Sequence, residues 1–233
     1  LEGTTITAHG GENALSVLAM AEEGGFLHSP DMYMHKIAYG KKYEGFNIDP
    51  EAPYDDIIKK FSKYTEMNLE NIVVCILDRA RHKDLIMKIR STGARIKLIP
   101  DGDVSAVIAT TFEDSGVDMY IGIGGSPEGV LAAAALRCIG GKIYAKLCFD
   151  DKKQIERAKN MGIADIDKIY ETNDLASGDV MFSATGVTDG TLLKGVLIKD
   201  NLATTHSVVM RSKTKTLRYV SATHDVSIKG IIS

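Results

Sequence analysis

The sequence has little net charge and no long apolar run. Its 28 Lys and Arg residues nearly balance 31 Asp and Glu residues, which leaves a formal net charge of −3. A near-neutral balance gives no electrostatic footprint for nucleic acid or for an anionic membrane surface. No apolar stretch is long and clean enough to span a bilayer. We therefore expect neither nucleic acid nor a membrane as a partner of this 233-residue chain.

Cysteine is also scarce. Cys75, Cys138 and Cys148 are an odd set, and none of them is spaced as a metal-binding pair or a CxxC motif. We expect buried, reduced thiols and a cytoplasmic protein. The chain opens on Leu1 without a charged and apolar leader, so we expect no signal peptide. We expect instead that the chain was processed or that another segment preceded it.

Strands and helices alternate through the middle of the chain. Apolar runs predict strands, and amphipathic or proline-started segments predict helices. The expected strands are 71–77, 95–99, 117–123 and 142–148, and the expected helices are 53–66, 81–91, 103–112, 127–139 and 151–161. This order favours βαβ units and a largely parallel sheet.

The two ends of the chain have a different pattern. Further strands are expected at 4–9, 14–21, 179–187, 195–199, 204–211 and 216–222, and a polar loop is expected at 28–36. No linker or repeat interrupts the chain, so we expect one compact unit with antiparallel strands toward its end. His35, His82, His206 and His224 have no assignable partner in the sequence, which favours structural or solvent-facing roles.

Three chemically complementary loops follow the three central strands. They read DRAR at 78–81, PDGD at 100–103 and GGSPEG at 124–129. Loops after parallel strands emerge at the same edge of a sheet, where ligands of open α/β sheets bind. We therefore expect the three loops to share one rim.

Each loop suits one part of a phosphorylated sugar. Arg79 and Arg81 match the geometry of phosphate, and Asp101 and Asp103 can accept from sugar hydroxyls or hold a hard cation. The third loop offers backbone amides at a helix start and the carboxylate of Glu128. Taken singly, each loop also fits a simpler interpretation: solvated arginines, a turn with a helix cap, or a tight glycine turn whose acid complements the helix dipole. Together they favour a sugar or polyol phosphate bound with a divalent cation.

A dinucleotide-binding loop is the main rival for the glycine-rich segment. After Gly122 and Gly124, the third glycine of G-x-G-x-x-G is replaced by Pro127. The segment also lacks the Gly-Lys-Ser/Thr of a P-loop. A nicotinamide-dependent enzyme is therefore disfavoured.

As a set, six motifs resemble the class II fructose-1,6-bisphosphatases, some of which also act on sedoheptulose 1,7-bisphosphate. They are LEGTT at 1–5, PDMYM at 30–34, DRAR at 78–81, PDGD at 100–103, GIGGSPEG at 122–129 and SATGVTDGTLLKGV at 183–196. The resemblance runs almost from end to end. It implies a layered α/β/α sandwich of the lithium-sensitive sugar phosphatase type, with central βαβ units and a mixed sheet.

The resemblance also implies roles for individual residues. Glu2 and Glu128 correspond to metal ligands, for Mn²⁺ or Mg²⁺, and Thr4 corresponds to the residue that orients or activates the attacking water. The implied substrate contacts are Glu2, Gly3, Thr4, Tyr33, Arg79, Ala80, Arg81, Asp101, Gly102, Asp103 and Gly125. The implied reaction is metal-dependent hydrolysis of the 1-phosphate of fructose 1,6-bisphosphate in gluconeogenesis. A homo-oligomer is also expected from the family.

The same resemblance implies that part of the family pattern is missing. Leu1-Glu2-Gly3-Thr4 match the last four positions of the signature Asp-Pro-Ile/Leu-Asp/Glu-Gly-Thr. The family's other metal-binding acids lie upstream, so residues 1–233 are expected to form a sugar phosphatase domain without its amino-terminal part. Because few carboxylates remain for the cation, we expect the chain alone to be weakly active or inactive. A non-catalytic sugar phosphate-binding protein is the alternative.

Overall fold

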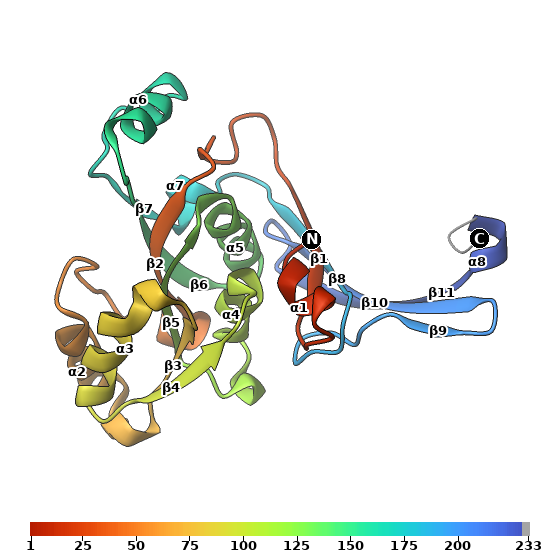
Figure 1. Cartoon of the computed structure of the whole chain (residues 1–233), viewed down its shortest axis with the longest axis horizontal. Helices are drawn as coiled ribbons and strands as arrows, with labels where there is room; N and C mark the ends of the chain where they lie inside the picture. The colour runs from red at the N-terminus through yellow and green to blue at the C-terminus, as the bar shows by residue number, and fades with distance from the viewer. Residues whose placement is uncertain (230–233) are drawn as a thin grey trace.

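A six-stranded sheet forms the centre of the computed structural model, which describes residues 1–229 (Figure 1). Its strands lie in the order β4 (Arg95–Ile99), β3 (Val73–Leu77), β5 (Met119–Gly125), β2 (Tyr33–Gly40), β6 (Gly141–Leu147) and β7 (Ile169–Glu171). β3 is parallel to β4 and β5, and the other neighbours are antiparallel. The mixed sheet is confirmed, but the expectation of a largely parallel sheet is wrong because β2 inserts between β5 and β6.

Helices cover both faces of this sheet. Along β2, successive side chains point to opposite faces. Ile37 and Tyr39 pack in the core beneath α2 (Tyr54–Thr65) and α3 (Lys83–Ser91), whereas Met34 and Ala38 pack in the core beneath α4 (Asp103–Ala109) and α5 (Ser126–Ile139). The α/β/α sandwich is therefore confirmed. The alternation along β2 also fixes which side chains can reach α4 and the loop before it.

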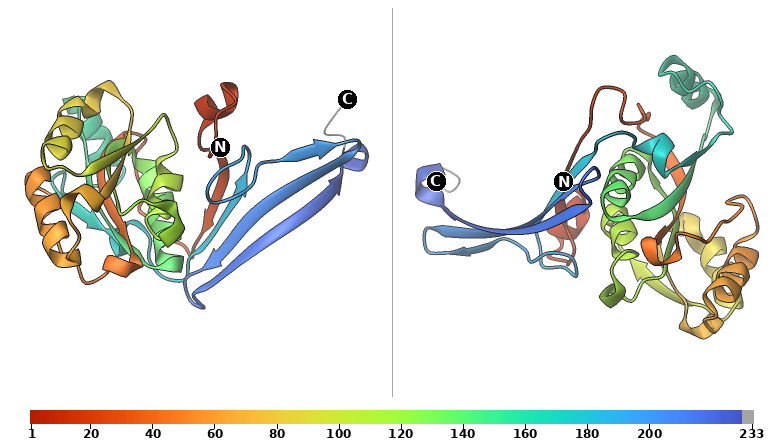
Figure 2. Two further views of the ribbon diagram at one scale, coloured as in Figure 1. Left: turned by 90° about the horizontal axis from the view of Figure 1, so that it is seen from below. Right: turned by 180° about the vertical axis from the view of Figure 1, so that it is seen from behind.

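A second sheet lies on the other side of α5. Its strands run in the order β1 (Leu15–Met20), β8 (Met181–Gly186), β10 (Leu202–Arg211) and β11 (Thr216–Asp225), with β9 (Leu197–Lys199) paired to β10, and every pairing is antiparallel. Phe182, Val208 and Met210 join the core cluster of α5. The β10–β11 hairpin extends well away from α2, α3, α4 and α5 (Figure 2). This sheet adds a fourth layer and confirms the expected antiparallel end.

Short helices complete the described part of the chain. They are α1 (Thr4–Ala8), α6 (Lys152–Asn160), α7 (Thr172–Leu175) and α8 (Val226–Lys229), with 3-10 turns at Lys41–Tyr43, Leu69–Asn71, Ala80–His82 and Glu113–Ser115. Among residues 1–229, no helix combines the length and the hydropathy that crossing a membrane requires.

Two segments near the amino terminus differ from the sequence prediction. Residues 4–9, predicted as a strand, mostly form α1, because Gly3 takes a left-handed conformation (φ 83°) that turns the chain into a helix. Residues 28–36, predicted as a polar loop, include the start of β2. The charged Lys36 disguised this strand, although its side chain is buried.

Candidate active site

The three predicted loops meet on one rim of the central sheet, as their contacts show. Arg79 Nη2 lies 3.9 Å from Asp101 Oδ1, which joins DRAR to PDGD. Arg81 donates to the Ile123 carbonyl through Nε at 3.0 Å and Nη2 at 2.7 Å, which joins DRAR to the end of β5. The predicted gathering of the loops is confirmed.

The glycines of GGSPEG make room for two carboxylates. A β-carbon at Gly124 would overlap Asp103 Oδ2, and a β-carbon at Gly125 would overlap Glu128 Oε2. Neither glycine has a positive φ, so what matters at these two positions is space and not backbone conformation. The bare backbone therefore lets the carboxylates of Asp103 and Glu128 lie directly against the end of β5.

Arg81 and Tyr33 form one surface of the rim. The guanidinium carbon of Arg81 lies 4.6 Å from the centre of the Tyr33 ring, an arrangement that favours the cation electrostatically. Tyr33 opposes Gly125 in the β2–β5 ladder and is 45% exposed, so it can contact a ligand. Ala80, between the two arginines, is exposed in the 3-10 turn.

His82 fixes the turn that carries these arginines. Its Nδ1 lies 2.7 Å from the Leu77 carbonyl, and its Nε2 accepts from the Ile123 amide at 2.8 Å. One ring nitrogen donates and the other accepts, as in a neutral imidazole. Burial lowers the pKa of His82, which favours the same neutral form. The structural role expected for this histidine is confirmed.

The amino-terminal motif packs against the PDGD loop. The Glu2 carboxylate accepts from the Val104 amide and, at 3.2 Å, from the Ser105 amide, so it caps the start of α4. Burial and the neighbouring Asp103 raise the pKa of Glu2 to about 8. Gly3 is buried, and Thr4 is exposed at the first position of α1. Its hydroxyl has no hydrogen-bond partner within residues 1–229, which leaves it available to a water or a ligand.

The candidate metal ligands do not form a complete cluster. Both oxygens of Glu2 accept backbone amides, while Glu128 is half-buried beside Gly125. No group of three or more His, Cys, Asp or Glu side chains is arranged to hold a metal ion within the described residues. Hard divalent cations usually need more oxygen ligands than two carboxylates provide. The described residues therefore do not fit a divalent cation on their own.

Two polar residues beneath the rim were not predicted from the sequence. Lys36 is 1% exposed, and its Nζ forms an ion pair with Asp103 and donates to the Gly125 carbonyl at 2.9 Å. Ser126 is fully buried; its hydroxyl donates to the Pro30 carbonyl, and its amide donates to the Met32 carbonyl at 2.8 Å. A lysine in an otherwise apolar, alternating segment was the one available signal for the first of these.

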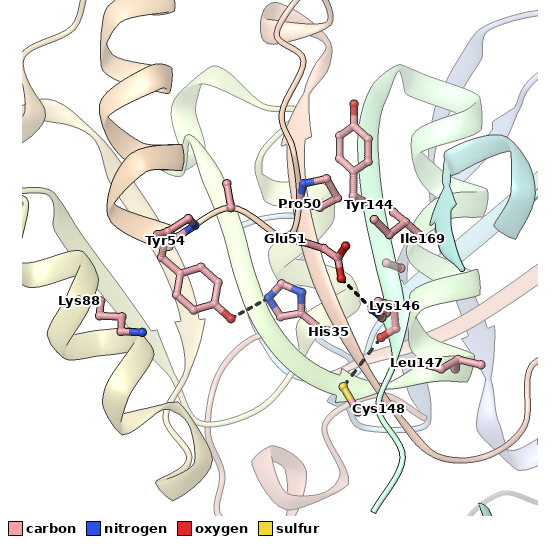
Figure 3. A pocket seen from close by; sticks show the side chains of 13 residues that line it. His35, Pro50, Glu51, Tyr54, Lys88, Tyr144, Lys146, Leu147, Cys148 and Ile169 are labelled. Atoms are coloured by element: carbon pink, nitrogen blue, oxygen red, sulfur yellow. Dashed lines mark hydrogen bonds and ion pairs between the residues drawn. The ribbon is translucent and has the colours of Figure 1, made fainter. Parts of the chain in front are cut away.

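A separate pocket opens on the α2–α3 side of the sheet (Figure 3), with a volume of about 520 Å³. His35, Tyr54, Lys146 and Cys148 are among its lining residues. Two of its polar contacts are internal: Lys146 to Glu51 at 2.7 Å, and the Tyr54 hydroxyl to His35 Nε2 at 3.1 Å. None of the predicted site residues lines this pocket, so it is distinct from the rim.

The pocket histidine gives a pH prediction. Burial, with smaller effects from His82 and Lys36, lowers the pKa of His35 to about 4 from its usual value near 6.5. Between these two pH values His35 binds more protons in the unfolded chain than in the folded chain. The contribution of the neutral His35 to the free energy of unfolding is therefore fully present above pH 6.5 and is lost as the pH falls toward 4. A shift of this size corresponds to a loss of the order of 3 kcal/mol.

His35→Gln keeps a polar side chain but removes the titration. We expect urea unfolding of this variant to show a shallower loss of stability than the wild type between pH 6.5 and 4. His28→Gln, at an exposed histidine, is the matched control and should follow the wild type. An equal decrease in the free energy of unfolding between pH 6.5 and 4 for the wild type and His35→Gln would contradict the prediction.

Comparison with known proteins gives a consistent family match. A family model described as bacterial fructose-1,6-bisphosphatase, glpX-encoded, matches residues 1–224. The chain is 40% identical over 236 residues to a protein of Trichodesmium erythraeum (strain IMS101) named D-fructose 1,6-bisphosphatase class 2/sedoheptulose 1,7-bisphosphatase, a match that covers 96% of this chain and 68% of the relative. Proteins with the same name from Crocosphaera subtropica and Synechococcus sp. (strain JA-2-3B'a(2-13)) are 40% and 39% identical, with the same coverage.

Proposed function

Because the chain belongs to the family of glpX-encoded bacterial fructose-1,6-bisphosphatases, we propose that it hydrolyses the 1-phosphate of fructose 1,6-bisphosphate. The products are fructose 6-phosphate and inorganic phosphate, and the reaction serves gluconeogenesis. Sedoheptulose 1,7-bisphosphate is a second substrate in this proposal, because the relatives' names include it. The observation that carries the proposal is the meeting of paired arginines, paired aspartates and the Gly125–Glu128 turn on one rim.

Each part of the rim has a role in binding the substrate. Arg79 and Arg81 bind phosphate charge, since a guanidinium suits the geometry of phosphate oxygens. Asp101, Gly102 and Asp103 bind the sugar through its hydroxyls, and the bare backbone of Gly125 lets the substrate approach closely. Tyr33 and Ala80 line the substrate beside the arginines. The positioned groups hold the scissile bond in a reactive geometry, which itself accelerates hydrolysis.

The amino-terminal motif supplies the remaining roles. Thr4 orients the attacking water, and Glu2 and Gly3 border the substrate. Hydrolysis in this family is metal-dependent. Glu2 and Glu128 are the residues of this chain that would help to hold the cation, which we propose is Mn²⁺ or Mg²⁺. The three cysteines are free, which supports a cytoplasmic setting. We further propose one sugar phosphatase domain over residues 1–233 and a homo-oligomeric assembly.

A second candidate function is a non-catalytic sugar phosphate-binding protein. It is favoured by the absence of a three-ligand metal cluster in residues 1–229 and by the two amide hydrogen bonds that occupy Glu2. Such a protein would keep the binding roles of DRAR and PDGD without hydrolysis.

The test measures phosphate release and fructose 6-phosphate binding on the same preparation. We expect saturable binding of fructose 6-phosphate and slow phosphate release from fructose 1,6-bisphosphate that needs added Mn²⁺ and stops with EDTA. The rate should be low because isolated carboxylates bind Mn²⁺ weakly. Binding without release at any Mn²⁺ concentration would select the binding protein. If a folded chain showed neither binding nor phosphate release, both the phosphatase and the binding protein would be overturned.

A further inference from the structure

A buried cation lies directly beneath the proposed substrate site. Lys36 is 1% exposed and lies in the middle of β2. Lysine is almost never this buried unless it is paired, because removing its charge from water is costly. The partners of its ammonium therefore account for the burial of Lys36. The contacts of Lys36 are seen in the structure, and only their effect on the substrate rests on the proposed function.

The ammonium joins two of the substrate loops. Nζ forms an ion pair with Asp103 of PDGD and donates to the carbonyl of Gly125 at 2.9 Å. Small residues make this reach possible: a β-carbon at Gly129 would lie 3.3 Å from Lys36 Cδ, and one at Gly124 would lie 3.0 Å from Nζ. β2, the start of α4 and the end of β5 thus converge on one charged atom.

The charge also balances two neighbouring carboxylates. Glu2 and Asp103 are both buried, and both lie at the start of α4. Without the ammonium, Asp103 would be a buried carboxylate beside a second acid with no counter-charge, which would favour a displaced side chain. Lys36 binds Oδ2 of Asp103, and Oδ1 has no hydrogen-bond partner within residues 1–229. The ion pair therefore orients one oxygen and leaves the other for a ligand.

We propose that Lys36 is a positioning residue for the sugar: its buried ammonium locks Asp103 and the Gly125 carbonyl into the geometry that binds the sugar hydroxyls. Its burial keeps it from touching the substrate, so it acts through these two partners. The phosphate subsite at Arg79 and Arg81 is built from other contacts. Loss of Lys36 should consequently weaken recognition of the sugar and spare recognition of free phosphate.

The test compares Lys36→Met with the wild type, using calorimetry with fructose 6-phosphate and with inorganic phosphate. We expect the affinity for fructose 6-phosphate to fall at least tenfold and the affinity for inorganic phosphate to change by less than twofold. Ile58→Ala, which truncates a fully buried side chain of α2, is the control for general destabilisation and should leave both affinities unchanged. An unchanged fructose 6-phosphate affinity in Lys36→Met, or an equal loss for both ligands, would overturn the proposal.

A comparison of two further variants tests the route through Asp103 and does not need Lys36→Met alone to fold. Asp103→Asn and Lys36→Met/Asp103→Asn should lose fructose 6-phosphate affinity by factors within about threefold of each other, because the ion pair is already broken in Asp103→Asn and only the contact of Lys36 with the Gly125 carbonyl is left to lose. A further tenfold loss in the double variant would contradict that route. If the wild type itself binds no fructose 6-phosphate, the proposed function fails; if the wild type binds and Lys36→Met binds equally, only the positioning role fails.

Discussion

Gly124→Ala should destabilise the chain by about 3–5 kcal/mol, the usual cost of breaking a buried ion pair, and should abolish measurable binding of fructose 6-phosphate. The added methyl group would overlap Asp103 Oδ2 and would lie 3.0 Å from Lys36 Nζ. Both atoms are buried, and each holds the other, so neither can move aside cheaply. Alanine is otherwise acceptable in a strand at negative φ, which isolates the effect of the collision.

Gly125→Ala is the matched control for this prediction. Its methyl group would also overlap a carboxylate, but Glu128 is half-buried, and its side chain can rotate away. We expect its free energy of unfolding to stay within about 1 kcal/mol of the wild type. Urea unfolding of the two variants measures the difference. Equal stability of Gly124→Ala and Gly125→Ala would show that the Asp103–Lys36 pair is not rigid.

Arg81→Met should lower the affinity for fructose 6-phosphate about 10- to 100-fold, which corresponds to the loss of a charge-assisted hydrogen bond. Arg81 is exposed, so its loss should have little effect on stability. Its two hydrogen bonds to the Ile123 carbonyl and its contact with Tyr33 hold the guanidinium over the rim. Arg81→Lys should give an intermediate loss, because it keeps the charge but not the planar fork.

Arg90→Met provides the control for net charge. Arg90 is an exposed residue in the last turn of α3, away from the DRAR loop. Calorimetry on the two variants at one salt concentration should show a loss only for Arg81→Met. An equal loss in both would mean that the ligand responds to the overall charge of the molecule and not to a defined subsite.

The sequence predicted the repeated strand–helix units well, because their signals are local. Apolar runs mark β3, β4 and β5. Glycine or proline marks one end of α3 and α4 and both ends of α5, at Gly93, Gly102, Pro127 and Gly140. Topology then placed DRAR, PDGD and GGSPEG together, since parallel strands deliver their following loops to one edge. This part of the candidate site needed no knowledge of distant contacts.

The remaining features depend on contacts between distant residues. β2 could not be recognised as the antiparallel centre of the sheet, because Lys36 looks like a surface residue until its partners Asp103 and Gly125 are known. Nothing in the sequence near Glu2 indicates a partner for its carboxylate. Its role as the cap of α4 depends on the amides of Val104 and Ser105, about a hundred positions away. The short helix α1 depends on the left-handed Gly3, which overrides the β-branched character of the following residues.

A crystal structure of the chain with fructose 6-phosphate would test the assignment of the rim most directly. The phosphate should lie beside Arg79 and Arg81, the sugar hydroxyls against Asp101 and Asp103, and the ring close to the bare backbone of Gly125. A ligand bound away from these loops, for example in the pocket beside His35 and Tyr54, would contradict the assignment of the rim as the substrate site.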